Sequence, residues 1–195
     1  MPKIISEYER ERTHEAIVHH TRQLIIAKKG IRDVTVDDIA RAVGIAKGSF
    51  YSYFKSKEEC FYQVLETTVA DVYQQIALIK QEKLSTKEKV EKFVREVYLT
   101  ETRVDYYFNT TDVEALFRKL PPEYSKREAN FIGDGLIADI MEMMGMERVH
   151  AEAFYKLLEC IEFASVSAIS EQAKEEVLDT LILSLAEYAG KHSTV

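Results

Sequence analysis

Residues 35–57, with the sequence TVDDIARAVGIAKGSFYSYFKSK, have the spacing of two short helices joined by a glycine turn. Thr35 is a favourable N-cap residue, and Asp38 three positions later completes the spacing of a capping box. Apolar residues then recur at helical intervals as far as Gly44, which ends the first helix. The stretch therefore predicts a helix-turn-helix unit, although an ordinary turn between two packed helices has a similar pattern.

The second helix of this stretch begins near residue 46 and places Phe50 and Phe54 on its buried side. Its outward side is small, polar and almost uncharged, whereas a helix that faces only solvent more often carries Lys, Glu and Gln. Small residues let a backbone approach the major groove of DNA, and hydroxyl groups reach phosphates. The expected DNA-binding residues are Thr35, Lys47, Gly48, Ser49, Tyr51, Ser52, Lys55 and Lys57.

The segment GIAKGSFYSYFKSKEE closely resembles the helix-turn-helix of the tetracycline-repressor (TetR) family of bacterial regulators. The resemblance covers residues 10–65 by motif and the remainder only by length and helical layout. It implies a three-helix DNA-binding domain in residues 1–55 and a helical effector-binding and dimerisation domain in residues 56–195. It also implies a homodimer that binds double-stranded operator DNA. A small-molecule effector is expected to release a repressor of this kind from its operator, although some members need their ligand to bind DNA.

The resemblance assigns phosphate contacts to several motif residues. Thr35 matches a position at the start of a helix that meets a phosphate, and helix N-termini favour anions independently of any family. Ser49, Tyr51 and Lys57 match other positions that contact phosphates. These residues are therefore expected to position the protein on the duplex rather than to read its sequence.

Base reading is expected at the start of the second motif helix. Lys47 and Gly48 match positions that lie against base edges, and a lysine there donates to guanine O6 or N7. Lys47 is therefore the expected base reader. Asp37 departs from the family pattern, since some members carry a basic residue there for a base contact. We expect Asp37 to stabilise the N-terminus of its helix instead.

Length, composition and charge fit this interpretation. The chain has 195 residues, 46% of them hydrophobic, and a net charge of −7. The charge is unevenly placed, because residues 1–57 contain 11 Lys and Arg against 7 Asp and Glu, whereas residues 58–195 contain 15 against 26. The basic part coincides with the motif. A helical protein-interaction module, the alternative class, would not explain that basic part.

Membrane, metal and enzyme functions are not expected. No apolar run approaches the roughly 18 residues that span a bilayer, and the N-terminus lacks an apolar signal core, so a cytoplasmic protein with no membrane partner is predicted. His19 and His20 diverge on a helix and make a poor metal pair. No cofactor, metal or catalytic constellation is expected. Cys60 and Cys160 are expected to be buried free thiols, with a redox pair as the alternative.

Helical periodicity recurs almost throughout the chain, which has seven glycines, three prolines and no alternating strand pattern. An all-α fold is therefore predicted. Capping-box spacings mark three helix starts, at Ser56 with Glu59, Ser85 with Glu88, and Thr111 with Glu114. The expected helices cover about residues 8–29, 35–43, 46–54, 57–80, 85–107, 111–120, 123–144, 148–172 and 175–192.

The last two helices carry apolar stripes wider than one packing partner needs. In the resembling family these helices pair with their copies in a four-helix dimer interface, and small residues allow close approach. The alternative is that both helices only complete an intramolecular core. The expected interface residues are Phe154, Ile161, Ala164, Ser165, Ala168, Leu178, Leu181, Ile182 and Leu185.

An effector cavity is expected among the helices that precede this pair. Aromatic residues at helical spacing are more often plain core, so that interpretation stays open. A buried Glu159 or Glu162 would need a partner or a cationic ligand, and we expect at least one of the two to be exposed. The candidate lining residues are Phe93, Val97, Tyr106, Tyr107, Phe108, Phe117, Phe131, Met141, Tyr155, Glu159 and Glu162.

Overall fold

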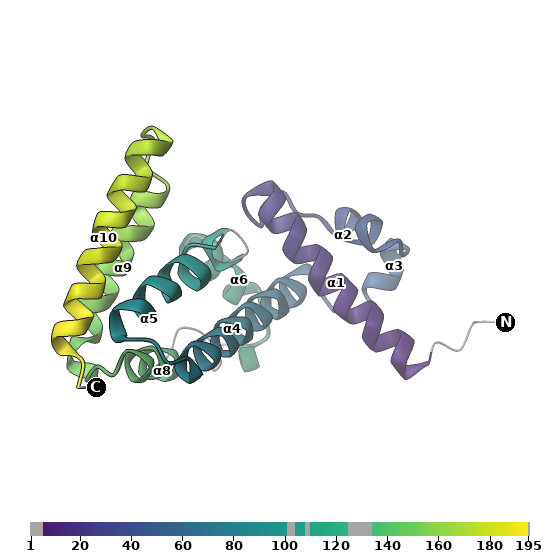
Figure 1. Cartoon of the computed structure of the whole chain (residues 1–195). Coiled ribbons are helices and arrows are strands. Elements are labelled where there is room, and N and C mark those ends of the chain that lie inside the picture. Colours follow the sequence, from purple (N-terminus) through teal and green to yellow (C-terminus); the bar gives the residue numbers. More distant parts are fainter. Residues whose placement is uncertain (1–5, 101–103, 108–109, 125–133, 195) are drawn as a thin grey trace. The chain divides into compact units, whose positions relative to one another are not determined.

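The computed structural model describes residues 6–100, 104–107, 110–124 and 134–194. Within these ranges every regular element is a helix, which confirms the all-α prediction (Figure 1). The elements are α1 (Glu7–Lys28), α2 (Val36–Val43), α3 (Lys47–Phe50), α4 (Lys57–Gln81), α5 (Thr86–Lys92), the π-helix η1 (Phe93–Tyr98), the 3₁₀ helix η2 (Val104–Tyr107), α6 (Thr110–Lys119), α8 (Asp134–Met144), the 3₁₀ helix η3 (Arg148–His150), α9 (Ala151–Ser165) and α10 (Glu171–His192).

The chain divides into two compact units. Unit 1 comprises Met1–Val69 and Glu101–Glu128, and unit 2 comprises Ala70–Thr100 and Ala129–Val195. The division falls inside α4, and the functional boundary between residues 55 and 56 stays a prediction. Unit 1 therefore contains η2 and α6 in addition to the three N-terminal helices.

In unit 1, α1 packs against α2 and η2. A complete capping box between Ser6 and Glu9 begins α1. The helix ends at Lys28 and is capped by Lys29, which adopts the left-handed conformation at φ 53°, so it ends one residue before the predicted end. The face that α1 buries consists of Ile17, Val18, Thr21 and Ile25.

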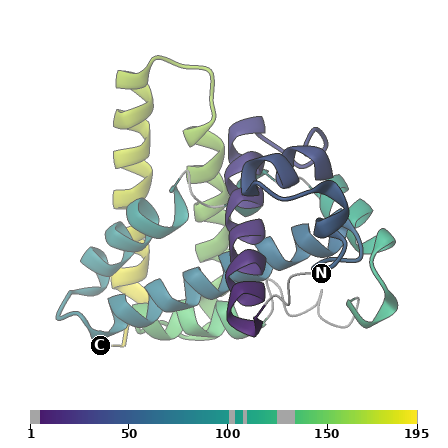
Figure 2. The same ribbon diagram turned by 90° about the vertical axis from the view of Figure 1, so that its right-hand side faces the viewer.

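In unit 2, α10 packs along α5 and α9, and Figures 1 and 2 show α9 and α10 side by side. The capping box of Ser85 and Glu88 that begins α5 is confirmed. The chain then passes directly into the π-helix η1, which ends at Tyr98, whereas the sequence predicted a helix as far as residue 107. One apolar cluster forms the core of this unit and includes residues of α4, α5, η1, α8, α9 and α10.

Several predicted helix boundaries are wrong. The helix expected over residues 148–172 ends at Ser165, because the chain turns there and Ser170 caps α10 by accepting from the Ala173 N–H at 3.3 Å. The last helix consequently begins at Glu171 rather than near residue 175. Thr111 is not an N-cap, since α6 already begins at Thr110.

Candidate nucleic-acid interface

Capping at both ends fixes α2 in unit 1. The Thr35 hydroxyl accepts from the Asp38 N–H at 3.2 Å, and the Asp38 carboxylate accepts from the Thr35 N–H at 3.0 Å, so the predicted capping box is confirmed. Gly44 ends the helix at φ 76°, as predicted. The Lys28 amine lies 2.8 Å from the Asp38 carboxylate, which ties the end of α1 to the start of α2. Hydrogen bonds from Lys28 and Thr35 hold the pKa of Asp38 well below its usual range.

An aromatic cluster packs against the buried side of α3. Phe50 and Phe54 are buried, as the spacing predicted, and their rings stack with centroids 5.6 Å apart. The α-helix itself has only four residues, and the chain reaches Phe54 through a further turn in which the Phe54 N–H donates to the Phe50 carbonyl at 3.1 Å. The His14 ring of α1 stacks on Phe54 with a centroid distance of 4.7 Å. The position of α3 is thus set by α1.

The outward side of α3 and its following turn is open. Tyr51 is 51% exposed, and a Cβ placed on Gly48 would meet no other atom within 4 Å. This geometry gathers most of the expected DNA-binding residues on one surface, which we call the α3 face. The exposed residues of the α3 face are Lys47, Gly48, Ser49, Tyr51 and Ser52.

The remaining expected DNA-binding residues lie at helix starts. Thr35 is exposed at the start of α2, and Lys55 is exposed before α4. Lys57 is half-buried as the first residue of α4, where its amine lies 3.4 Å from the Val34 carbonyl and 5.5 Å from the centre of the Phe61 ring. A phosphate contact by Lys57 would therefore compete with the Val34 carbonyl for the amine.

An ion pair that the sequence analysis missed joins α2 to α3. The Lys47 amine lies 2.6 Å from the Asp37 carboxylate, and both side chains are 55% exposed. This hydrogen bond raises the pKa of Lys47 above its ordinary value. Asp37 was expected only to favour its own helix N-terminus. The two residues are ten positions apart on different helices, so helical spacing does not reveal the contact.

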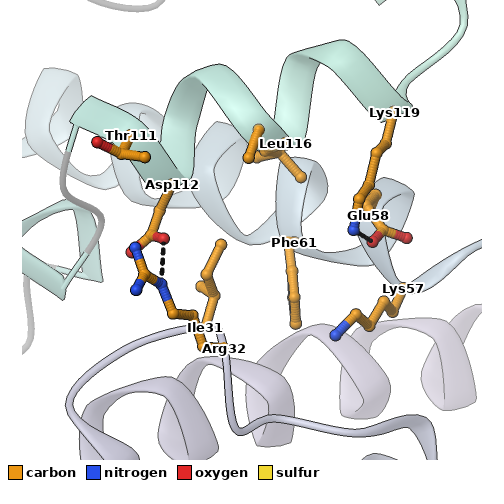
Figure 3. Close-up of a pocket in the computed structure, with 10 residues that line it drawn as sticks. Ile31, Arg32, Lys57, Glu58, Phe61, Thr111, Asp112, Leu116 and Lys119 are labelled. Carbon is orange, nitrogen blue, oxygen red and sulfur yellow. Dashed lines mark hydrogen bonds and ion pairs between the residues drawn. The ribbon is translucent and has the colours of Figure 1, made fainter.

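A cavity of about 400 Å³ lies within unit 1. Figure 3 shows that it has an apolar interior with an ion pair on either side: Arg32 to Asp112 at 2.8 Å, and Lys119 to Glu58 at 3.1 Å. None of the candidate effector-lining residues lines this cavity. Its lining consists of Ile31, Arg32, Lys57, Glu58, Phe61, Thr111, Asp112, Ala115, Leu116 and Lys119.

The candidate effector-lining residues that are described are divided between the two units. Phe93, Val97 and Met141 are buried in the core cluster of unit 2, which favours the plain-core interpretation. Tyr107 and Phe117 belong to unit 1, where the Phe117 ring packs edge-on against Tyr62. The Tyr106 side chain, Phe108 and Phe131 lie outside the described residues.

The polar candidates of unit 2 differ in their surroundings. Glu159 is exposed, which agrees with the prediction that at least one of the two glutamates is exposed, and its carboxylate lies 2.8 Å from the Lys156 amine. Glu162 is half-buried and accepts a hydrogen bond from the Tyr98 hydroxyl at 2.7 Å. The Tyr155 hydroxyl is buried and has no hydrogen-bond partner among the described atoms. Burial, and secondarily the nearby Tyr73, raises the pKa of Tyr155 to about 12.

Much of the predicted dimer interface is buried within the protomer itself. The apolar stripes of α9 and α10 are therefore partly intramolecular core, and the buried residues among them have little surface to offer a partner. These buried residues are Phe154, Ile161, Ala164, Ile182 and Leu185. Ser165, Leu178 and Leu181 are half-buried, and Ala168 is exposed. Other apolar side chains between residues 149 and 183 are exposed and were not predicted as interface residues, namely Val149, Phe163, Val166, Ile169, Val177 and Leu183.

The two cysteines have different environments. Cys60 is buried, and burial raises the pKa of its thiol to about 12 although the Thr21 hydroxyl lies 3.4 Å away. Cys160 is exposed, so the prediction of two buried thiols is wrong for it. In the part of the chain that is described, no three His, Cys, Asp or Glu side chains gather as they would around a metal ion. No helix there is both long and apolar enough to cross a bilayer.

Comparisons with known proteins match the N-terminal part of the sequence. The family described as bacterial regulatory proteins, tetR family, matches residues 17–64. The HTH-type transcriptional regulator EthR of Mycolicibacterium smegmatis is 33% identical over 55 residues, which are 28% of this chain and 25% of that protein. The HTH-type transcriptional repressor KstR2 of Rhodococcus jostii is 41% identical over 49 residues, which are 25% of this chain and 24% of that protein. The match spans about a quarter of each relative.

Solved structures extend the likeness to the fold of nearly the whole chain. A transcriptional regulator from Cytophaga hutchinsonii superposes with a TM-score of 0.58 at 19% identity, over 91% of this chain and 96% of that chain. RolR in complex with resorcinol superposes with a TM-score of 0.50 at 16% identity, over 97% of this chain and 96% of that chain. At such low identity the likeness shows the fold alone.

Proposed function

We propose that this chain, whose residues 17–64 match the tetR family of bacterial regulatory proteins, is a transcriptional regulator whose α3 face binds double-stranded operator DNA. The observation that carries this proposal is the α3 face itself. A short helix is seated on buried Phe50 and Phe54 and presents small, hydroxyl-bearing and basic side chains outward. A surface of this kind suits the major groove, because its backbone approaches base edges while its hydroxyl and amine groups reach phosphates.

Within the α3 face, we assign two kinds of contact. Ser49, Tyr51, Ser52 and the nearby lysines bind phosphates, and Lys47 beside Gly48 reads a base edge. The unequal charge of the chain supports this arrangement, since residues 1–57 carry a net +4 and residues 58–195 a net −11. A local basic surface attracts DNA while an acidic remainder limits non-specific adhesion.

The proposed regulator acts as a homodimer, joined through the exposed side of α9 and α10. Six large apolar side chains are exposed between Val149 and Leu183, and Phe163 is the most exposed of them at 76%. Phe163 lies on α9, and Val177 and Leu183 lie on α10, so a dimer contact there would remove these side chains from water. A two-fold symmetric dimer presents two α3 faces to a palindromic site.

We further propose that a small molecule bound in unit 2 releases the dimer from its operator. The support is α4, one continuous helix that begins at Lys57 beside the α3 face and contributes Ile76 and Ile79 to the core of unit 2. A rearrangement of that core would act on a helix whose N-terminal end continues into the DNA-binding residues. In a corepressor-dependent or activating regulator of the same family, the ligand would act through the same helix but would raise the affinity for DNA.

DNA titration at several salt concentrations tests the main proposal. Operators are first selected from random duplexes, and binding is followed by fluorescence anisotropy. If the dimer neutralises about six phosphates, log K falls against log salt with a slope near −5. A slope near zero, or equal affinity for every duplex, overturns the proposal.

Variants then separate positioning from reading. Tyr51→Phe and Lys57→Ala should weaken all duplexes by nearly the same factor. Lys47→Ala should reduce discrimination at one base pair of each half-site by about 5- to 150-fold. If Lys47→Ala instead weakens every single-base variant of the operator equally, this lysine is a phosphate contact.

Calorimetry tests ligand control once an effector is identified. By linkage, a releasing effector binds the operator-bound dimer more weakly than the free dimer, by the same factor with which it weakens DNA, typically about 5- to 150-fold. Equal affinities in the two titrations rule out ligand-controlled DNA binding.

A further inference from the structure

Two adjacent aspartates at the start of α2 take part in different networks. Asp38 closes the capping box with Thr35 and also binds Lys28, so its carboxylate serves the scaffold. Asp37 points away from that network and binds Lys47 of α3, with its carboxylate oxygen 2.6 Å from the lysine amine. Asp37 is therefore the acidic side chain that is aimed at the α3 face.

The position of this ion pair coincides with the expected base-reading site. Asp37 lies in the first turn of α2, and Lys47 is the first residue of α3, immediately before Gly48. Both side chains are 55% exposed, so the pair lies at the surface proposed to meet DNA. This ion pair thus joins the two helices of the motif at their starts.

The Asp37 carboxylate changes which groups of DNA the Lys47 amine contacts. A lone lysine has a long flexible stem, and its point charge is attracted to any phosphate in reach. A carboxylate on the same amine confines the stem and offsets its charge. It is also repelled by phosphates, yet it accepts hydrogen bonds from the cytosine N4 amino group at a base edge. The pair therefore disfavours backbone contact relative to contact with base edges.

We propose that Asp37 is a positioning residue for sequence recognition, because it holds Lys47 so that the amine is presented to a base edge rather than to the phosphate backbone. This inference rests on the proposed function of the α3 face. It assigns Asp37 a role that favours specificity at the expense of affinity for arbitrary DNA. Removal of its charge should accordingly strengthen binding to arbitrary DNA while weakening discrimination between sequences.

The test compares Asp37→Asn with Glu15→Gln in the full-length protein. Glu15 is exposed on α1, so its substitution removes the same charge from unit 1 without touching Lys47. Affinities are measured for the selected operator, its single-base variants and an unrelated duplex across a salt series. For Asp37→Asn, discrimination at one base pair should fall at least about fivefold, and the salt slope should steepen by roughly 2, because two freed lysines per dimer bind phosphates. Glu15→Gln should change neither quantity.

A double-mutant cycle shows whether Asp37 acts through Lys47. In a Lys47→Met background, Asp37→Asn should leave discrimination and salt slope unchanged, and Asp37→Glu in the native background should restore most of the discrimination. If Asp37→Asn costs the same discrimination with and without Lys47, then Asp37 reads DNA itself and the positioning role is refuted. If the native protein binds operator specifically but Asp37→Asn matches it in both readouts, the inference fails while the proposed function stands. If the native protein binds no DNA selectively, the proposed function fails first.

Discussion

Gly48→Ala separates the fold of the α3 face from its function. The added methyl group points into open space, since no other atom lies within 4 Å of the Cβ position. Gly48 lies within α3, where alanine is favoured over glycine by about 0.5–1 kcal/mol. The unbound protein should therefore be as stable as the native protein or more stable by up to about that amount. Chemical denaturation followed by circular dichroism measures this change.

DNA binding by Gly48→Ala should change in the opposite direction. If the backbone at Gly48 packs closely against base edges, the extra methyl group meets DNA and costs about 1–3 kcal/mol per half-site, as overpacking does elsewhere. Fluorescence anisotropy with the selected operator measures the loss. Gly44→Ala is the matched control, because its Cβ also meets no atom but its φ of 76° makes alanine strained, so it should destabilise the fold. Unchanged operator affinity in a stable Gly48→Ala protein refutes the close approach.

Three further outcomes follow from individual side chains. Because the pKa of Asp38 is lower in the folded than in the unfolded protein, its stabilising contribution is complete above the ordinary value of 3.8 and is lost as the pH falls towards the folded value. The free energy of unfolding should therefore fall more steeply with acid in the native protein than in Asp38→Asn. Parallel curves of unfolding free energy against pH contradict this. Under native conditions a thiol reagent should modify Cys160 and spare Cys60, and two rapidly reacting thiols per chain contradict the burial of Cys60. Phe163→Lys should yield a folded monomer by analytical ultracentrifugation, since Phe163 is 76% exposed in the protomer, whereas a persistent dimer places the interface elsewhere.

Local chemistry made the DNA-binding motif predictable from sequence. The reciprocal hydrogen bonds of Thr35 and Asp38, the left-handed Gly44, and the burial of Phe50 and Phe54 each depend on residues within a few positions of one another. Such contacts are encoded by spacing.

Features that depend on distant contacts were not predictable in this way. Apolar periodicity continues through Val166 and Ile169, which made α9 and the following turn look like one helix, although Ser170 followed by Glu171 has the composition of a helix start. The same periodicity does not distinguish core from interface, so buried Phe154 was expected in the interface and exposed Phe163 was not. The π-helix η1 was not predicted for a related reason, because an apolar pattern with a period of 3.6 residues does not distinguish an α-helix from the wider π-helical turn.

The four-residue length of α3 limits how the DNA-reading element can be transplanted. A helix that short is not stable by itself in water, because the free-energy cost of helix nucleation exceeds the stabilisation that one turn of hydrogen bonds provides. Its conformation is supplied by the aromatic stack of His14, Phe50 and Phe54, so one of the three supporting rings comes from α1. A synthetic peptide of residues 35–57 should thus be a random coil without sequence preference. A chimaeric regulator with a new DNA preference must inherit the whole segment from α1 to Phe54 as a single graft.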